Sequence, residues 1–495
     1  MKDVISMRDF SREDIMSLIN EALKIKKDRH GQNAYPATRG KIASLFFENS
    51  TRTRVSSETA AYHQGLMCNG FSGVEGTSVK KGEPLMDTAR MFAGYGYGAI
   101  IMRHPLAGAA RLVGDHLDIP VINAGDGSSG HPTQTLLDLM TIYETFGKLD
   151  GLQIAMVGDL KYGRTVHSLL QALELFESKI HLLSPDNLQC PPWRLDDYRK
   201  QSGKDVHVCD ATSDAFLSLL RKTDVVYMTR IQRERFPEGT EGEAEFLKVA
   251  GLFCLQKNML GQARPDLIIL HPLPRDKFNL EIAMDVDETK HARYFEQAKN
   301  GLYMRQAIIA RITEGSLSGR AKHGENHPAG FVELPIIHGE KKGENLLYRL
   351  DSGTLIDHIE CGKGPMVYRM LGLHSIVDSE VVLSMNIKSQ RWGRKDVLAI
   401  HGRELTPEQL YKVALIGQHH TINVIQCKKV IKKGRMLLPS QLRNFVICPN
   451  PLCVSRREHK EYAPGIFNVE LHSPLQVRCH YCEQLLDRQE IELYE

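Results

Sequence analysis

Four cysteines form two close pairs in the last part of the sequence, Cys448 with Cys453 and Cys479 with Cys482. The second pair has the two-residue spacing of a zinc knuckle, and the first spans a longer loop rich in turn-forming residues. Because tetrahedral zinc takes four thiolates, the two pairs are predicted to share one structural zinc ion per chain. Such a closed shell supports folding and leaves no open position for catalysis.

Two disulfides, or four buried thiols, are the alternatives to zinc. Residues 1–5 lack the apolar segment of a signal peptide, and no apolar run is long enough to cross a membrane. We therefore expect a cytoplasmic, reducing compartment, which favours the metal. The other six cysteines are scattered and are predicted to be buried, inert thiols: Cys68, Cys190, Cys209, Cys254, Cys361 and Cys427.

Cationic and hydroxyl side chains follow short apolar runs in the N-terminal part of the sequence. The runs are 42–47, 99–102, 154–157, 225–228 and 267–270. The residues directly after them include Ser50, Thr51, Arg52, Thr53 and Arg54, then Arg103, Arg164, Arg230 and the segment 271–275. Hydroxyls and amides at a helix start, together with arginines, are typical of a phosphate site. An ordinary capped helix with solvated arginines is the alternative.

Arg103, Arg164 and Arg230 each follow a different apolar run. A fold that brings these three side chains together would bind a multiply charged anion. His131 opens another predicted helix and adds one imidazole to this cationic group. Neighbouring arginines favour its neutral form, which can donate a hydrogen bond to a carbonyl. His63, His104 and His167 are predicted to be structural. The sequence carries no Walker motif and no glycine triplet for a dinucleotide, so we expect no organic cofactor.

Continuous apolar runs alternating with helical segments predict parallel sheets covered on both faces. Ligands of such sheets bind at the carboxyl ends of the strands, which is where the polar residues gather. The fold class is therefore predicted as α/β. A polar, glycine-rich stretch from Thr313 to about Asn345 predicts a linker. The length of 495 residues and a formal net charge of +3 fit several globular domains without a general affinity for nucleic acid or membrane.

The motifs together resemble aspartate carbamoyltransferase. The match rests on five segments in the same order: 46–54, 102–105, 131–134, 228–230 and 271–275. After the linker, residues 356–359, 393–396 and the four cysteines resemble the zinc-bearing regulatory chain of that enzyme. The sequence thus resembles a fusion of catalytic and regulatory chains. The implied fold is two doubly wound parallel-sheet domains, then an α+β regulatory domain and a small β-rich zinc domain.

The resemblance implies domain limits and an activity. The expected domains are a carbamoyl phosphate-binding domain at 1–135, an aspartate-binding domain at 136–312, the linker at 313–345, a nucleotide-binding regulatory domain at 346–440 and a zinc-binding domain at 441–495. The implied reaction transfers the carbamoyl group of carbamoyl phosphate to L-aspartate in pyrimidine biosynthesis. Catalytic trimers bridged by regulatory dimers would give a homo-oligomer of six chains.

Residue roles follow from the same resemblance. Ser50, Thr51, Arg52 and Thr53 would hold the phosphate. Thr53, Arg103 and His131 would polarise the carbamoyl oxygen, and Gln134 with the carbonyls of Pro272 and Leu273 would bind the carbamoyl amide. The aspartate carboxylates would meet Arg164, Thr165, Arg230 and Gln232. Ser78 and Lys81 would reach a neighbouring subunit's site, with Lys80 as the alternative to Lys81.

Nucleotide effectors are implied as well, held by Asp357, His358 and Lys433. Relatives carry a nucleotide-contacting lysine where Ala399 stands, so we expect CTP, UTP or ATP to bind with weakened or altered coupling, or the domain to be only a structural bridge. Ornithine carbamoyltransferase is a second candidate, but Pro272 stands where its sequences have cysteine, and Arg230 and Gln232 favour an anionic substrate. A nucleic-acid-binding zinc ribbon is a third, suggested by the basic residues Lys428, Lys429, Lys432, Lys433 and Arg435.

Overall fold

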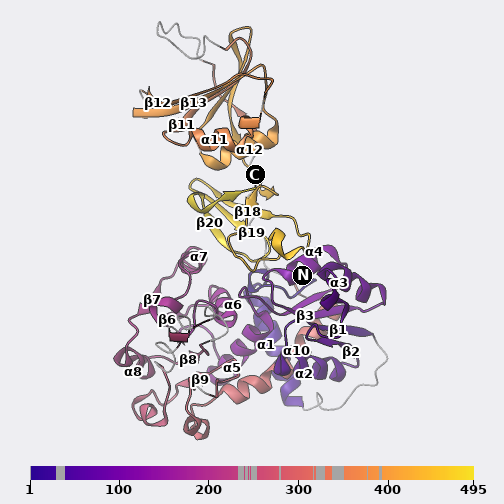
Figure 1. Cartoon of the computed structure of the whole chain (residues 1–495). Helices are drawn as coiled ribbons and strands as arrows, with labels where there is room; N and C mark the ends of the chain where they lie inside the picture. Colours follow the sequence, from indigo (N-terminus) through magenta and orange to yellow (C-terminus); the bar gives the residue numbers. More distant parts are fainter. Residues whose placement is uncertain are drawn as a thin grey trace. The chain divides into compact units, whose positions relative to one another are not determined.

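The computed structural model describes residues 2–28, 40–231, 239, 243–244, 246, 253–277, 280–315, 317–318, 329–336, 350–375, 377–389, 393–417 and 419–494. The chain divides into two compact units (Figure 1): Met1–Lys322 with Leu452–Ala463, and His323–Pro451 with Pro464–Glu495. Among the described residues, no helix combines the length and apolar character needed to cross a membrane.

The first unit begins with a parallel sheet in the order β2-β1-β3-β4. Its strands are β1 (Lys41–Phe46), β2 (Met67–Ser72), β3 (Ala99–His104) and β4 (Val121–Asp126). The helices of this part are α1 (Arg12–Asp28), α2 (Thr51–His63), α3 (Leu85–Gly94) and α4 (Ala109–His116). All positions of β4 and nearly all of β1 and β3 are buried, which explains the apolar runs of β1 and β3.

A second parallel sheet follows in the order β7-β6-β5-β8-β9. Its strands are β5 (Gln153–Val157), β6 (Lys179–Leu183), β7 (Val206–Cys209), β8 (Val225–Met228) and β9 (Ile268–Leu270). The surrounding helices are α6 (Arg164–Leu173), α7 (Pro192–Ser202) and α8 (Ser213–Lys222). Alternate residues of β5 enter two different hydrophobic clusters, so both faces of this sheet are covered. The predicted parallel α/β fold is confirmed.

Two long helices join the two sheets. Helix α5 (Pro132–Phe146) and helix α10 (Tyr294–Glu314) pack against each other, and α10 also packs on α1 and α2. Their buried side chains share one hydrophobic cluster with β1 and β5, including Leu136 and Met304. Helix α5 runs through residues 135 and 136, where the sequence places a domain boundary. The connection between the two sheets is therefore a rigid helix.

The second unit contains an antiparallel sheet in the order β10-β15-β14-β11-β13-β12. Its strands are β10 (Gly330–Glu333), β11 (Gly353–Glu360), β12 (Val381–Ser389), β13 (Gly393–His401), β14 (Thr421–Gln426) and β15 (Lys429–Leu437). Helices α11 (Gly364–Met370) and α12 (Pro407–Ile416) share a hydrophobic cluster with Ile356, Leu398 and Ile400 from one face of the sheet. This arrangement confirms the α+β expectation.

Strand β10 lies inside the segment that the sequence predicts as linker. Much of the predicted linker, 313–345, lies outside the described residues, which omit 316, 319–328 and 337–349. Within the described part, β10 pairs with β15 over Gly330–Glu333. The ring of Phe331 lies against Gly434, where no side chain intervenes, and Lys432 Nζ is 4.4 Å from the ring centre. A four-residue strand shows too little alternation of apolar and polar residues for the sequence alone to distinguish it from a linker.

The C-terminal region is rich in short strands. One sheet has the order β16-β18-β19-β20, with β16 (Gln441–Arg443), β18 (Ile466–His472), β19 (Leu475–Cys479) and β20 (Leu485–Asp487). Strand β17 (Val446–Ile447) pairs with β21 (Glu492–Leu493). The segment Leu452–Ala463 belongs to the first unit, where Ala107 exchanges backbone hydrogen bonds with Leu452 and Val454. The predicted small β-rich domain is thus confirmed as a fold.

Candidate active site and cysteine cluster

A cavity of about 820 Å³ opens at the carboxyl ends of strands from both parallel sheets. It collects polar residues that lie far apart in the sequence, and arginines are the main charged side chains. The predicted site residues that line it are Ser50, Thr51, Arg52, Thr53, Arg103, His131, Gln134, Arg164, Thr165, Arg230, Pro272 and Leu273. The parallel strand direction explains this convergence, because every strand of such a sheet delivers its following loop to the same edge.

One wall of the cavity is the start of helix α2. Ser50 is the N-cap residue in an extended conformation, and its side chain makes no capping bond in the described part of the chain. The first amides of the helix are therefore available to an anion at this end. Arg52 lines the cavity beside them, and burial lowers the pKa of its guanidinium. Thr53 is buried, with its hydroxyl 3.5 Å from His131 Nε2.

Glu48 bridges two of the arginines. Its Oε1 accepts from Arg103 Nη2 at 2.7 Å and from Arg164 Nη2 at 2.6 Å. Burial alone would raise the pKa of this carboxyl, but Arg164 and Arg103 outweigh it and lower the pKa to about 2. Burial and the charge of Arg164 lower the pKa of Arg103 to about 10. One carboxylate thus reduces the repulsion between two cations held in the same cavity.

His131 sits at the N-terminus of α5 and is 4% exposed. Burial, followed by the charges of Arg103, Arg164 and Arg305, lowers its pKa well below the ordinary value. The imidazole is therefore neutral at physiological pH, as the sequence predicts. Burial lowers the pKa of His131 more than the arginines do. The sequence did not reveal that this histidine is buried. Thr133 Oγ1 lies 3.3 Å from Nδ1, so each ring nitrogen has a hydroxyl beside it.

A buried carboxylate orients the amide of Gln134. Asp138 is fully buried; its Oδ1 accepts from Gln134 Nε2 at 2.8 Å and from Gln297 Nε2 at 2.6 Å, and its Oδ2 accepts from Tyr227 Oη at 2.9 Å. Burial raises the pKa of Asp138 to about 7, partly offset by these hydrogen bonds. Because the Gln134 nitrogen is engaged, its amide oxygen is the free end of the side chain.

The loop after β9 forms the facing wall. The backbone N–H of Leu273 donates to His271 Nδ1 at 2.8 Å, and the N–H of His271 donates to Gln297 Oε1 at 2.9 Å. Leu273 has a positive φ of 53°, which a leucine adopts only where its surroundings enforce it. These hydrogen bonds connect the loop to the Asp138 network, so one set of buried polar groups positions both Gln134 and the segment 272–273.

The other predicted site residues lie elsewhere. Ser78 and Lys81 are in a short 3₁₀ helix, Ser78–Lys81, where both are exposed and neither lines the cavity. Lys80 pairs with Glu75 at 2.7 Å, whereas no ion pair of Lys81 occurs among the described residues. Gln232 lies outside the described residues.

Sequence reasoning missed Glu48, Asp138, Gln297 and Arg305, of which all but Asp138 line the cavity. Glu48 follows directly after the first apolar run, but an acidic residue contradicts the simple expectation of an anion site. Asp138 lies four residues after Gln134 on one helix, and this spacing is the available signal for a side-chain hydrogen bond. Arg305 is buried on α10, and nothing in its sequence surroundings distinguishes it.

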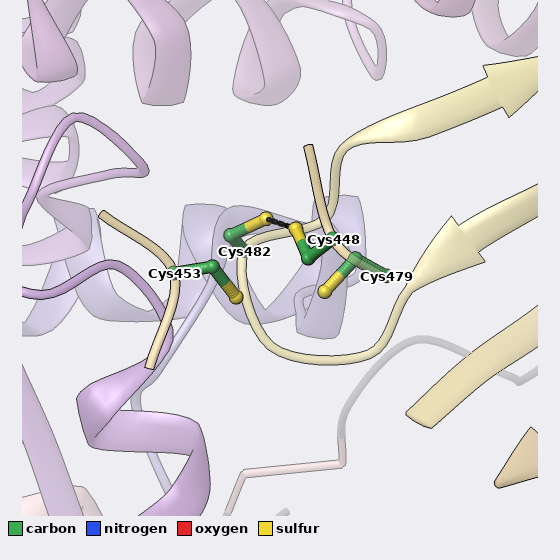
Figure 2. Close-up of side chains that lie close together, drawn as sticks. All are labelled: Cys448, Cys453, Cys479 and Cys482. Atoms are coloured by element: carbon green, nitrogen blue, oxygen red, sulfur yellow. Dashed lines mark hydrogen bonds between the residues drawn. The ribbon is translucent and has the colours of Figure 1, made fainter. Parts of the chain in front are cut away.

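The four paired cysteines form one cluster, shown in Figure 2. Their sulfur atoms all lie within 4.8 Å of one another, and all four residues are buried. Cys448 Sγ is 3.4 Å from Cys482 Sγ, and none of the four forms a disulfide. Four convergent buried thiols suit a tetrahedral zinc ion, so the donor set fits one structural zinc per chain and excludes the disulfide alternative.

The other six cysteines vary in exposure. Cys190 is buried, and burial raises the pKa of its thiol to about 12, as expected for an inert side chain. Cys68, Cys209 and Cys254 are partly exposed, and Cys361 and Cys427 are exposed. The prediction that all six are buried is therefore wrong for most of them. Cys361 and Cys427 lie at or beside strand ends, where the chain turns at the surface.

The predicted effector residues lie on the antiparallel sheet. A row of paired residues crosses it through Val382, Ala399, Leu355, Asn423 and Lys433. This row faces away from α11 and α12, since Leu355 and Ala399 belong to the opposite cluster.

Asp357 is two residues from Leu355, and its Oδ1 lies 2.5 Å from Lys395 Nζ. His358 follows it at a register shift with a positive φ of 59°. Asp357 and Lys433 therefore share one face, with β14 between their strands. Buried Ala399 lies on β13, on the other side of the strand that carries Asp357.

Profiles of four protein families match consecutive parts of the chain. "Aspartate/ornithine carbamoyltransferase, carbamoyl-P binding domain" covers residues 2–144, and the "Asp/Orn binding domain" covers 150–312. "Aspartate carbamoyltransferase regulatory chain, allosteric domain" covers 347–437, and its "metal binding domain" covers 440–492. The catalytic subunit of aspartate carbamoyltransferase from Chromobacterium violaceum is 47% identical over 311 residues, which are 63% of this chain and 97% of that protein. The chain belongs to the aspartate carbamoyltransferase family.

Other relatives agree with this assignment. The aspartate carbamoyltransferase catalytic subunit of Thermococcus kodakarensis is 47% identical over 64% of this chain and 98% of its own length. Among solved structures, the catalytic subunit of M. jannaschii aspartate transcarbamoylase is 41% identical, with a TM-score of 0.56, over 64% of this chain and 99% of its own. The enzyme from Trypanosoma cruzi in complex with carbamoyl phosphate and aspartate is 36% identical, with a TM-score of 0.57, over 62% and 95%.

The family assignment decides between the earlier alternatives. This aspartate carbamoyltransferase family member is a transferase whose catalytic domains are fused to the allosteric and metal-binding domains of the regulatory chain. The reported relatives are named for aspartate, not for ornithine. The basic residues 428–435 lie at strand β15 of the sheet matched by the allosteric domain, so they are not part of the zinc-bearing sheet.

Proposed function

We propose that this chain transfers the carbamoyl group of carbamoyl phosphate to the amine of L-aspartate, giving carbamoyl aspartate and phosphate. The main support is the cavity in which Arg52, Arg103, Arg164 and Arg230 meet the neutral imidazole of His131 and a helix N-terminus. Such a set of donors suits two anionic substrates and an oxygen that becomes negative during the reaction.

In the proposed reaction, the amine lone pair attacks the carbamoyl carbon and the carbonyl becomes a tetrahedral oxyanion. Thr53, Arg103 and His131 donate to this oxygen. The carbon–oxygen bond to phosphate then breaks, the proton that the amine loses passes to the departing phosphate, and phosphate leaves at the start of α2 near Arg52. Preorganised donors that meet the charge only as it develops supply the rate enhancement. Because His131 is neutral, it contributes a hydrogen bond without adding another positive charge to the cavity.

The carbamoyl amide would meet only acceptors. Asp138 holds the Gln134 nitrogen, which leaves the amide oxygen to accept from the carbamoyl NH₂ group. The carbonyls of Pro272 and Leu273 would accept its second hydrogen. Arg164 and Arg230 would bind the carboxylates of aspartate, with Thr165 beside them and Gln232 as a further proposed contact.

Product formation tests this proposal directly. The purified chain is incubated with carbamoyl phosphate and L-aspartate, and carbamoyl aspartate and phosphate are quantified together over a range of aspartate concentrations. L-ornithine at the same concentrations is the control substrate. We expect equal amounts of the two products from aspartate and no measurable citrulline. Turnover of ornithine at a rate comparable to aspartate would refute the assignment of the second substrate.

We further propose that the site is completed by Ser78 and Lys81 of a neighbouring subunit within a homo-oligomer. Both residues are exposed and away from their own cavity, and Lys81 rather than Lys80 is without an ion pair among the described residues. Inactive Arg52→Ala chains mixed with inactive Lys81→Ala chains should regain part of the activity, because some mixed sites carry both native residues. Absence of recovery after verified subunit exchange would rule out sharing.

The regulatory part is proposed to bind nucleotides through Asp357, His358 and Lys433, in an assembly of catalytic trimers bridged by regulatory dimers. The shared sheet face of Asp357 and Lys433 supports this, and Lys395 adds a cation beside Asp357. The ten cysteines without a disulfide suit a reducing compartment such as the cytoplasm.

A further inference from the structure

A second group of metal-ligating side chains lies in the first unit, away from the cavity. Among the described residues, two groups could hold a metal ion: the four paired cysteines, and His181 with His207 and Cys209. The ligand atoms of the three residues all lie within 4.8 Å of one another. None of the three lines the cavity, so the proposed carbamoyl transfer does not use them.

The parallel pairing of β6 and β7 explains why these side chains meet. His181 is the register partner of His207, and Leu183 is the partner of Cys209. Since side chains alternate along a strand, His207 and Cys209 point to the same face of the sheet. The ring centres of the two histidines are 5.4 Å apart, with planes at 83°. Strand β7 is the edge strand, so the cluster is open to solvent on one side.

His181 has one ring nitrogen that makes no hydrogen bond within the described part of the chain. Its Nε2 is 3.3 Å from Gln153 Oε1, which can only accept a hydrogen bond, so Nε2 carries the proton. Its Nδ1 therefore keeps a lone pair; this atom is buried and has no hydrogen-bond partner among the described residues. A hydrogen bond that fixes the tautomer of a histidine is a common companion of metal ligation. A metal cation could be coordinated by this lone pair of His181 Nδ1.

We propose that His181, His207 and Cys209 bind one divalent cation of the zinc class, with a water molecule as the fourth ligand. Two imidazoles and one thiolate are a borderline-soft donor set, which suits zinc better than magnesium or calcium. Zinc–nitrogen and zinc–sulfur bonds place neighbouring ligand atoms about 3.5 Å apart, so the three ligand atoms, which all lie within 4.8 Å of one another, draw closer together when the metal binds. The thiol of Cys209 loses its proton when the metal binds.

Nearby charges limit the affinity. Burial, and then the charges of His207, Lys222 and Lys179, lower the pKa of His181 to about 4, so its imidazole is neutral and able to ligate at pH 7. The same two lysines oppose a cation, and burial raises the pKa of Cys209. The site has three protein ligands where the other cluster has four thiolates. It is therefore the weaker of the two and loses its metal first under a chelator.

Bound metal would fasten the edge strand β7 to β6. Among the strands that the structure describes, the four residues of β7 pair with β6 alone, so a shared metal adds a second kind of connection between these two strands. The sequence interpretation of Cys209 as an inert thiol is then replaced by that of a metal ligand. The expected consequence is local protection of the edge, with no effect on the cavity.

The test uses the full chain and zinc itself. The protein is equilibrated with zinc, freed of excess metal by gel filtration, and its zinc content is measured by mass spectrometry. We expect two zinc ions per chain in the unchanged protein and one in Cys209→Ser and in His207→Gln. Cys254→Ser is the matched control, because Cys254 is equally half-exposed, has a pKa raised by burial, and belongs to no cluster among the described residues. It should keep both ions.

Cobalt substitution provides a second readout. Thiolate–cobalt absorbance in the near ultraviolet should fall by about one fifth in Cys209→Ser, because one of five thiolate ligands is lost. Circular dichroism and carbamoyl transfer should stay unchanged, which shows that the variant is folded. The proposal is overturned if the unchanged protein binds one zinc per chain, or if Cys209→Ser retains the second ion and the full cobalt absorbance.

Discussion

The arginine cavity and the four-cysteine cluster carry opposite charges when they bind their ligands: the cavity is positively charged, and the cluster becomes negatively charged around a cation. The cavity holds several like charges close together and neutralises only part of them through Glu48. The cysteine cluster gathers four groups that are neutral as thiols and become a compact anionic shell only around a cation. The first site is built before its ligands arrive, and the second is completed by its ligand.

Because of this difference, we expect the cavity to determine the reaction rate and the cysteine cluster to determine the stability of the fold. Burying several like charges lowers the free energy of unfolding, so the cavity reduces the stability of the chain in return for its ability to bind anions. The cysteine cluster has no open position, so its metal contributes folding energy and no catalytic group. Changes in the cavity should therefore reduce the rate without unfolding the chain, and changes in the cluster should do the reverse.

The largest effect is expected for the cavity. Arg52→Ala and His131→Ala should each lower the rate of carbamoyl transfer by about 10²- to 10³-fold, the usual cost of one lost donor to a developing charge. Arg54→Ala is the matched control, because Arg54 lies on the same helix, pairs with Glu58 at 2.7 Å and does not line the cavity. Steady-state kinetics with both substrates measures the change. A loss in Arg54→Ala as large as that in Arg52→Ala would contradict the assignment.

Removal of the structural zinc should produce the second largest effect, now on folding. Cys448→Ser, or chelation, is expected to abolish hydrogen-exchange protection in residues 446–482, since the four sulfurs hold this region together. Carbamoyl transfer should persist, and the proposed assembly of trimers and dimers should lose mass. Cys361→Ser, at an exposed cysteine, is the control that should change none of these. Full protection in the metal-free protein would argue against a structural ion.

Acid should destabilise the first unit through its buried neutral histidines. Burial lowers the pKa of His104 to about 4 and of His271 to about 3, while the unfolded forms protonate near 6.5. Below pH 6.5 the unfolded chain binds protons that the folded chain does not, so stability falls as the pH decreases. Each such histidine contributes about 1.4 kcal/mol per pH unit between 6.5 and its folded pKa.

His104→Asn tests this slope, because asparagine can still accept the hydrogen bond that Leu106 N–H donates to Nδ1. Urea unfolding from pH 7 to pH 5, followed by hydrogen exchange in residues 99–116, should show a shallower pH dependence in the variant. His116→Asn, at an exposed histidine in the last turn of α4, is the matched surface substitution. An identical slope in His104→Asn and the unchanged protein would assign the acid sensitivity to other groups.

The smallest effect on catalysis is expected in the regulatory sheet. Lys433→Ala should weaken binding of CTP or ATP by about 10- to 100-fold, the worth of one charge-assisted hydrogen bond, with no change in rate at saturating aspartate. Lys429→Ala on the same strand is the control. Titration calorimetry measures affinity, and aspartate saturation curves measure coupling. Heat of binding that is unchanged in Lys433→Ala would remove this lysine from the nucleotide site.

The sequence was most informative where chemistry depends on neighbours in the chain. The spacing of Cys479 and Cys482, and the run from Ser50 to Thr53 before a helix, specify their sites because a turn or a helix start brings these atoms together locally. The parallel sheets followed equally from local patterns, since apolar runs ending in polar residues are required when both faces are covered. Strand β10 was missed because four residues provide too short a pattern.

Tertiary structure decided the pairings between distant residues. Glu48 meets Arg164 across 116 positions, and Asp138 meets Gln297 across 159, so neither contact leaves a trace in local spacing. The two histidines beside Cys209 meet only because β6 and β7 pair in one particular register. Local sequence thus determined which groups are present and where the elements begin, whereas packing determined their partners. The physical reason is that charge compensation and burial depend on three-dimensional distance, which a linear pattern does not record.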